Sequence, residues 1–160
     1  MNASLVQDPA RRAALVPWLV AGCGFLLLYV PTLLSLLDSI WGSDEQGHGP
    51  IVLGITIWLI YRRWGELTDT RASAPLPWAA WPLLLAGAAS YALGRSQGIW
   101  LFEVGSSIAM VCGIVLLLRG PTQLRCIGFA IFFMFFMIPL PGAVVDALTQ
   151  PMKMAVSYVA

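Results

Sequence analysis

Long apolar runs, each closed by arginines or by a polar stretch with glycine or proline, set the pattern of this 160-residue chain. They fall near residues 14–37, 50–62, 78–93, 99–118 and 126–139. Helices of about 20 apolar residues cross the hydrocarbon core of a bilayer. The pattern therefore predicts an all-α, polytopic transmembrane bundle of about five spans, within a single membrane domain over residues 1–160.

Beyond the last apolar run, polar and apolar residues alternate with a helical period. Polar residues recur at helical spacing from Asp146 to Ser157, with valine, leucine and methionine between them. Segment 143–160 is therefore expected to be an amphipathic helix at the outer surface, or the start of an incomplete sixth span. Because the pattern is still running at Ala160, we expect the chain to be the N-terminal fragment of a longer protein.

Composition agrees with a membrane protein. Hydrophobic residues make up 59% of the chain and charged residues 11%, which is outside the range of soluble domains. The net charge of +1 and the absence of a basic run give no reason to expect a nucleic acid partner, so the expected surroundings are the lipid bilayer.

The few charges predict the orientation. Counted up to the end of the fifth run, one side of the expected membrane carries a single basic residue, Arg95, and the other carries seven: Arg11, Arg12, Arg62, Arg63, Arg71, Arg119 and Arg125. Cytoplasmic loops carry the excess of Lys and Arg. The bias predicts a multi-pass protein with a cytoplasmic N-terminus.

One polar stretch is distinctive: Asp44-Glu45-Gln46-Gly47-His48-Gly49-Pro50, which holds the only histidine. The glycines favour a tight turn, and Pro50 suits the first position of a helix. The apolar helix that follows has about 12 residues, or ~18 Å, against a hydrocarbon core of ~30 Å. Either this helix does not span the membrane, or the loop lies below the membrane surface in a protein-walled cavity. An ordinary extracytoplasmic loop with an interfacial histidine is the alternative.

Glu103 lies about four residues into the fourth run, on the side expected for His48 and Arg95. Intramembrane carboxylates usually face a partner or a wet cavity. Glu103 is thus expected either to pair with Arg95 at the interface or to form a wall of the cavity. The candidate cavity-lining or substrate-facing residues are Asp44, Glu45, His48, Arg95 and Glu103.

The cysteines predict no catalytic site. Cys23, Cys112 and Cys126 have no spacing typical of disulfides or zinc, so no metal site and no cofactor are expected. Each is expected too far from His48 to form a Cys-His dyad with it. Val20-Ala21-Gly22-Cys23 is similar to a lipoprotein lipobox, but the apolar sequence after it favours an uncleaved first helix.

Small residues predict one packing contact. Ala86, Ser90 and Gly94 are spaced by four on the third run, and Gly105, Ala109 and Gly113 on the fourth. Such stripes let membrane helices approach closely. We expect the two faces to meet.

Several of these stretches together resemble the exosortases. The N-terminal signature of that family is similar to Trp41 with Asp44 to Pro50 and Tyr61-Arg62-Arg63-Trp64. The middle region is similar to Phe135-Phe136-Met137-Ile138-Pro139-Leu140-Pro141 and Leu148-Thr149-Gln150-Pro151-Met152-Lys153. The exosortase B subtype is favoured by Tyr91-Ala92-Leu93-Gly94-Arg95-Ser96-Gln97 and Phe102-Glu103-Val104-Gly105-Ser106.

The resemblance implies a cysteine transpeptidase or protease of the bacterial inner membrane. Its partners would be substrate proteins with a C-terminal sorting signal of the PEP-CTERM kind, in bacteria that make exopolysaccharide. The family's nucleophile lies in an Ala-Cys-Ser/Gly-Gly type motif, which this sequence does not contain. No catalytic residue is therefore transferred to this chain, and His48 belongs to the N-terminal motif. The alternative function is a non-enzymatic membrane subunit of a polysaccharide export or transport assembly.

Overall fold

A computed structural model describes residues 9–39, 41, 47–68, 74–138, 149–151, 154 and 157–158. Throughout these ranges the regular structure is helical, which confirms the all-α prediction. The elements are α1 (Pro9–Ser39), α2 (Gly49–Arg62), α3 (Trp64–Thr68), α4 (Pro77–Gln97), α5 (Trp100–Leu118), α6 (Pro121–Cys126), α7 (Gly128–Met134) and a 3-10 turn, η1 (Phe135–Met137).

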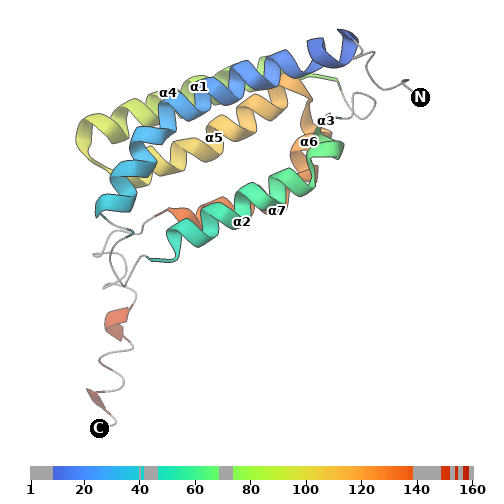
Figure 1. The fold of residues 1–160 in the computed structure, drawn as a ribbon. Helices are drawn as coiled ribbons and strands as arrows, with labels where there is room; N and C mark the ends of the chain where they lie inside the picture. Colours follow the sequence, from blue (N-terminus) through green and yellow to red (C-terminus); the bar gives the residue numbers. More distant parts are fainter. Residues whose placement is uncertain are drawn as a thin grey trace.

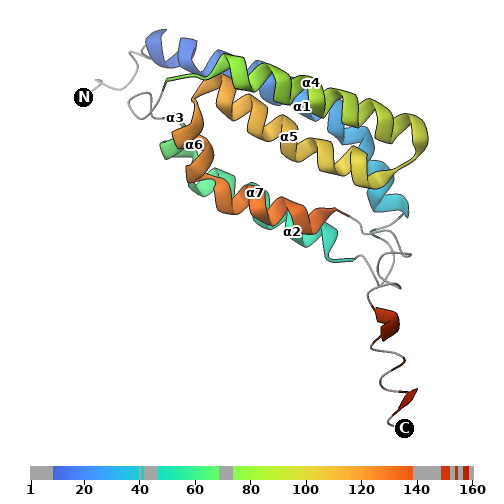
Figure 2. The ribbon, with the colours of Figure 1, turned by 180° about the vertical axis from the view of Figure 1, so that it is seen from behind.

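The helices form two layers (Figures 1 and 2). Helices α1, α4 and α5 make one layer, α2 and α7 make the other, and α3 and α6 join the layers at one end. Two groups of buried side chains hold the layers together near opposite ends. One contains Leu36, Trp41, Val52, Val104 and Met137, and the other contains Leu67, Val115 and Ile127.

Two helices are long and apolar enough to cross a membrane, Leu15–Ser39 and Trp100–Leu118, within the part of the chain that the structure describes. Gly49–Arg62 and Gly128–Met137 are apolar but shorter. Helix α4 has 21 residues, but its alanine- and glycine-rich sequence does not reach the same hydropathy. The structure thus supports a helical membrane domain, whereas the count of about five spans remains a prediction.

One expected run ends later in the structure than predicted, and another agrees with it. The third was expected to end at Leu93, but α4 continues to Gln97 and ends at Gly98, whose φ of 65° forms the left-handed cap that glycine favours. The fifth, expected over residues 126–139, contains α7 and η1, and the short helix α6 lies before it. It stops at Ile138 in extended backbone (φ −72°, ψ 117°), as expected before Pro139.

Helices α4 and α5 pack closely, as predicted, but through partly different residues. Gly94 and Gly113 are buried, and a Cβ on Gly113 would lie 2.7 Å from the side chain of Leu84. Ala86 is exposed, however, and the nearest side chain to Gly105 is Ile138. The buried small residues of α4 recur every seven positions, at Ala80, Gly87 and Gly94, so the stripe with spacing of four was wrong for this helix. A repeat of seven keeps one seam facing a partner helix.

The expected amphipathic segment 143–160 lies mostly outside the described residues. Only residues 149–151, 154 and 157–158 of it are described, and they are helical.

Candidate functional site

The segment before α2 is held by a tryptophan. Trp41 is buried, and its backbone N–H donates to the carbonyl of Leu36 at 2.8 Å. Its indole lies directly against Gly49, where a Cβ would overlap the ring. Gly49 is therefore required for close approach of Trp41 to the start of α2, a role that its sequence position alone did not reveal.

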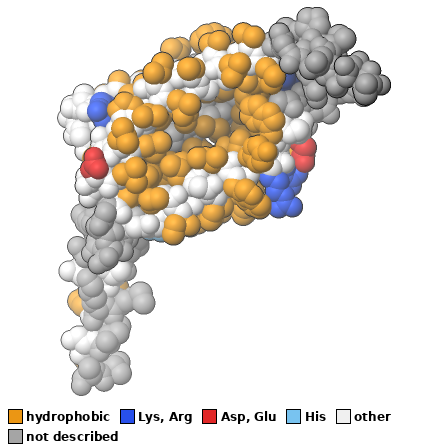
Figure 3. Space-filling view, in the orientation of Figure 1, with side chains coloured by type: hydrophobic (Ala, Val, Ile, Leu, Met, Phe, Trp, Pro, Cys, Tyr) orange, Lys and Arg blue, Asp and Glu red, His pale blue; other side chains and the backbone are white. Residues whose placement is uncertain are grey.

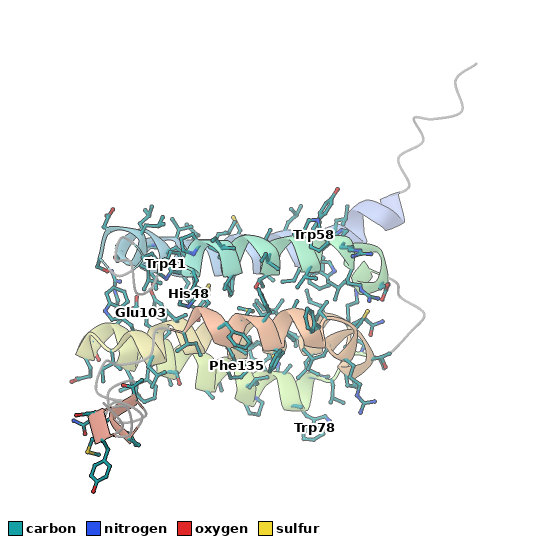
Figure 4. The ribbon with its side chains drawn as sticks, turned by 90° about the horizontal axis from the view of Figure 1, so that it is seen from below. Trp41, His48, Trp58, Trp78, Glu103 and Phe135 are labelled. Carbon is teal, nitrogen blue, oxygen red and sulfur yellow. The ribbon has the colours of Figure 1, made fainter. Side chains whose placement is uncertain are left out.

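His48 sits just before α2. Its carbonyl accepts the first helical hydrogen bond, from the N–H of Val52 at 3.0 Å, and Pro50 occupies the first turn as predicted. The imidazole is exposed. Figure 4 shows His48 at the same end of the bundle as Trp41 and Glu103, with Trp58 and Trp78 toward the other end.

Glu103 is the most deeply buried ionisable group among the described residues of this end, with a relative exposure of 2%. Its Oε1 accepts hydrogen bonds from the Thr32 hydroxyl at 2.6 Å and from Arg95 Nη1 at 2.9 Å. These donors come from α1 and α4, so the carboxylate of α5 links three helices. Of the two arrangements expected for Glu103, the structure has the ion pair with Arg95, but on a buried carboxylate.

Further hydroxyl groups extend this polar cluster. The hydroxyls of Tyr29 and Ser106 are 2.6 Å apart, and Ser106 also donates to the carbonyl of Glu103 at 2.6 Å. Tyr91 donates to the carbonyl of Leu28 at 2.8 Å, and its ring meets that of Tyr29 edge-on at 5.3 Å. We call the set of Tyr29, Thr32, Tyr91, Arg95, Glu103 and Ser106 the polar cluster.

Arg95 and Glu103 were candidate residues from the sequence, whereas the other four members of the polar cluster were not. A signal was available: Tyr29 and Thr32 are three residues apart in an apolar helix, as are Glu103 and Ser106, and such pairs share a helix face. Asp44 and Glu45 lie outside the described residues.

A cavity of about 100 Å³ lies between the layers rather than around His48. Residues of α1, α2, α5 and α7 line it, and the wall is apolar carbon. His48, Arg95 and Glu103 do not line it. The cavity and the polar cluster nevertheless share Tyr29 and Thr32, which have one side toward each.

Cys126 lies at the end of α2 opposite to His48. Cys126 hydrogen-bonds to Glu66, which also pairs with Arg63 at 2.8 Å. Arg63 follows the end of α2 and His48 precedes its start, so they are separated by roughly 22 Å of helix. Cys112 is partly buried in α5, and Cys23 is exposed on α1. Within the described ranges, no group of three or more His, Cys, Asp or Glu could hold a metal ion.

At the end of the bundle formed by α3 and α6, neighbouring groups change the pKa of a carboxylate. The pKa of Glu66 is lowered from its ordinary value because its carboxylate accepts a hydrogen bond from Cys126 and further bonds from Arg63. This end, formed by α3 and α6 with the termini of α2 and α5, also contains Arg62, Arg119 and Arg125.

Comparison with known proteins assigns the family. The family model described as "Transmembrane exosortase (Exosortase_EpsH)" matches residues 40–160, well over half of the chain. No curated protein and no solved structure matches the chain. The matched region contains the Trp41–Gly49 contact, His48, Arg95 and Glu103, and the helices are those of a membrane protein. This chain belongs to the transmembrane exosortase family.

Proposed function

We propose that this chain is the N-terminal, substrate-facing part of an exosortase-type cysteine transpeptidase or protease that processes C-terminal sorting signals of the PEP-CTERM kind. The observation that carries the proposal is the family match over residues 40–160, which includes the Trp41 to Pro50 segment. The protein would act in exopolysaccharide-producing bacteria, and the residues around Tyr91 to Ser106 favour the B subtype.

The arrangement of charges supports an inner-membrane location with the N-terminus in the cytoplasm. The end of the bundle that contains α3 and α6 carries Arg62, Arg63, Arg119 and Arg125, whereas the opposite end carries Arg95. An excess of arginine marks the cytoplasmic side. His48 and the polar cluster would then face the outside, where sorting signals are processed.

Within such an enzyme, we infer that these residues would support the reaction without carrying out its covalent step. The sequence lacks the family's cysteine motif, so attack on the peptide carbonyl would need a thiolate that residues 1–160 do not supply. His48 is exposed at the same end of the bundle as Arg95, where it would be free to contact a substrate. Glu103 and Arg95 would hold the helices around it in place.

The first test reads the gene beyond the codon for Ala160. A continuing frame with a Cys motif and later Arg and His is expected; a native stop codon at this point would contradict the proposal. The second test expresses the full reading frame with a tagged protein that carries a sorting signal, and follows cleavage on immunoblots. His48→Ala is expected to lower cleavage severalfold at unchanged abundance, whereas Asp38→Ala, at an exposed site of the same end, should not.

The alternative, a non-enzymatic transport subunit, would use the polar cluster as a proton or ion relay. A relay requires polar groups at successive depths of the membrane. Among the described residues, the hydrogen bonds of the cluster stay near one end, and the next ion pair, Arg63–Glu66, is at the other. The geometry therefore supports the enzyme better than the relay.

A further inference from the structure

One face of α2 joins a row of apolar side chains to an arginine. Ile51, Ile55, Trp58 and Arg62 follow one another at helical spacing, which places them in line along one side of the helix. All four side chains are exposed, Ile51 by 65% and Trp58 by 54%. Figure 3 shows apolar side chains over this layer of the bundle and basic side chains where α2 meets α3. We call these four residues the α2 stripe.

Arg62 lies against the tryptophan of the α2 stripe. The Cζ atom of its guanidinium group is 5.4 Å from the centroid of the Trp58 ring, within the range of a cation–π contact. Trp58 lies toward the α3 end of the bundle, as Figure 4 shows. The contact therefore holds a positive charge at the point where the apolar part of the stripe ends.

The charge of Arg62 is not balanced by a carboxylate. The next residue, Arg63, pairs with Glu66 at 2.8 Å, whereas Arg62 is in no ion pair among the described residues. Glu66 is also the only described carboxylate at this end, and Arg119 and Arg125 add further positive charge there. An anion that approaches this end would thus meet an excess of arginines.

The length of α2 brings the arginine to the depth of lipid headgroups. The helix has 14 residues, or roughly 21 Å, against a hydrocarbon core of ~30 Å. A bilayer accommodates so short a helix by local thinning and by long flanking side chains that reach the interface. The guanidinium of Arg62 would then meet lipid phosphates, while the apolar part of the stripe stays among acyl chains.

This combination of groups selects the kind of ligand. A water-soluble anion would use the arginine but not the exposed apolar side chains, and a neutral apolar molecule would use only the latter. A phospholipid uses both, because its phosphate accepts hydrogen bonds from the guanidinium and its acyl chain covers the apolar residues. The excess of arginines favours a headgroup with a net negative charge over a zwitterionic headgroup.

We propose that the α2 stripe binds one anionic phospholipid, with the lipid phosphate on Arg62 and an acyl chain along Trp58, Ile55 and Ile51. The proposal requires that α2 contacts the bilayer, in keeping with the membrane family of this chain. It does not depend on the proposed peptidase reaction, so the two can fail separately.

The first experiment measures lipid preference by native mass spectrometry. The full-length gene product is purified in detergent and supplied with equal amounts of phosphatidylglycerol and phosphatidylcholine that have the same acyl chains. We expect phosphatidylglycerol to be retained severalfold more often. Arg62→Gln should weaken its binding about fivefold, the factor for one arginine near a membrane surface.

Arg125→Gln is the matched control, since it removes the same charge from an exposed site at the same end but outside the stripe. It should weaken the binding of phosphatidylglycerol by less than twofold. An equal loss in the two variants would show attraction to a general basic surface and would overturn the site. Equal retention of the two lipids by the wild-type protein, or retention of neither, would overturn it as well.

The second experiment tests the aromatic and apolar parts of the site. Trp58→Leu keeps an apolar side chain but removes the ring beneath Arg62, and should weaken the binding of phosphatidylglycerol about threefold, the factor for an exposed cation–π contact. Trp78→Leu is the control, because Trp78 is 75% exposed and makes no cation–π contact with a described residue. Equal effects of these two variants would overturn the role of Trp58.

A competition distinguishes a lipid from a free phosphate. Glycerol 3-phosphate has the phosphate without the acyl chains, so it should not displace phosphatidylglycerol at equal concentration. Displacement would show that the apolar part of the stripe contributes nothing, and would overturn the assignment of a lipid.

Discussion

The two Arg–Glu pairs of this protein have the same chemistry and very different surroundings. Arg95 and Glu103 are 2.9 Å apart, and Arg63 and Glu66 are 2.8 Å apart. The Glu103 side chain is 3% exposed and connects α5 with α1 and α4, whereas both side chains of the second pair are more than half exposed and only three residues apart. The N–O distance alone therefore does not distinguish an ion pair that connects helices from an ion pair on the surface.

The two pairs are expected to differ in their contribution to stability, because water can solvate the separated partners of only one of them. Water solvates Arg63 and Glu66 at once, so an exposed pair contributes little to stability. Thr32 and the Glu103 carboxylate have no such access, because both are buried, although Arg95 itself is about half exposed. A buried partner left without its hydrogen bond is strongly destabilising.

The largest expected effect comes from separating α4 and α5 at the buried pair. A Cβ on Gly94 would overlap the backbone nitrogen of Glu103, so Gly94→Ala must move the start of α5. We expect the free energy of unfolding in detergent micelles to fall by about 3 kcal/mol or more. Gly54→Ala is the matched control, since no atom lies within 4 Å of its Cβ position, and it should be neutral or slightly stabilising. Equal stability of the two variants would show that α4 and α5 are not in close contact there.

Removal of the buried carboxylate should have the next largest effect. Glu103→Ala leaves Thr32 and Arg95 without their acceptor, and we expect a loss of about 2 kcal/mol, since Arg95 remains partly hydrated. Glu103→Gln keeps a carbonyl oxygen for both donors and should recover part of the loss. The midpoint of thermal unfolding, followed by circular dichroism, distinguishes the three proteins. If alanine and glutamine variants unfold together at the wild-type midpoint, the buried pair is no more important than the exposed one.

The exposed pair should give the smallest effect, visible in reactivity rather than in stability. Glu66→Gln is expected to leave the unfolding midpoint unchanged. The substitution removes the negative charge beside the Cys126 thiol, and this removal favours the reactive thiolate. Labelling of Cys126 by a maleimide should therefore become severalfold faster. Cys23, exposed in α1, serves as the internal control with unchanged rate. A lower unfolding midpoint, or an unchanged labelling rate of Cys126, would contradict this description of the exposed Arg63–Glu66 pair.

Much of the fold could be predicted because its signals are local. Apolar runs gave α1, α2 and α5 within a few residues, and Pro50 marked the first turn of α2. The end of α4 was misjudged because Arg95-Ser96-Gln97 is polar, although the arginine is kept in the helix by its bond to Glu103. The boundary between α6 and α7 at Ile127 falls at the start of the fifth run that the apolar pattern predicted.

The candidate site was predictable only in part, because most of its contacts join residues far apart in the chain. Glu103 and Arg95 are eight residues apart and could be paired from the sequence. Thr32 is 71 residues from Glu103, and Tyr29 is 77 residues from Ser106. Nothing in a local pattern states which faces of distant helices meet.

The sequence by itself determined that this chain is a helical membrane protein, where most of its helices begin, and which family motif precedes α2, because hydrophobicity and backbone preference act over a few residues. Only the tertiary structure decided that Glu103 binds Thr32, that Trp41 lies against Gly49, and that an apolar cavity lies between the two layers. These features depend on which helix faces pack together, and packing is settled by contacts between residues far apart in the chain.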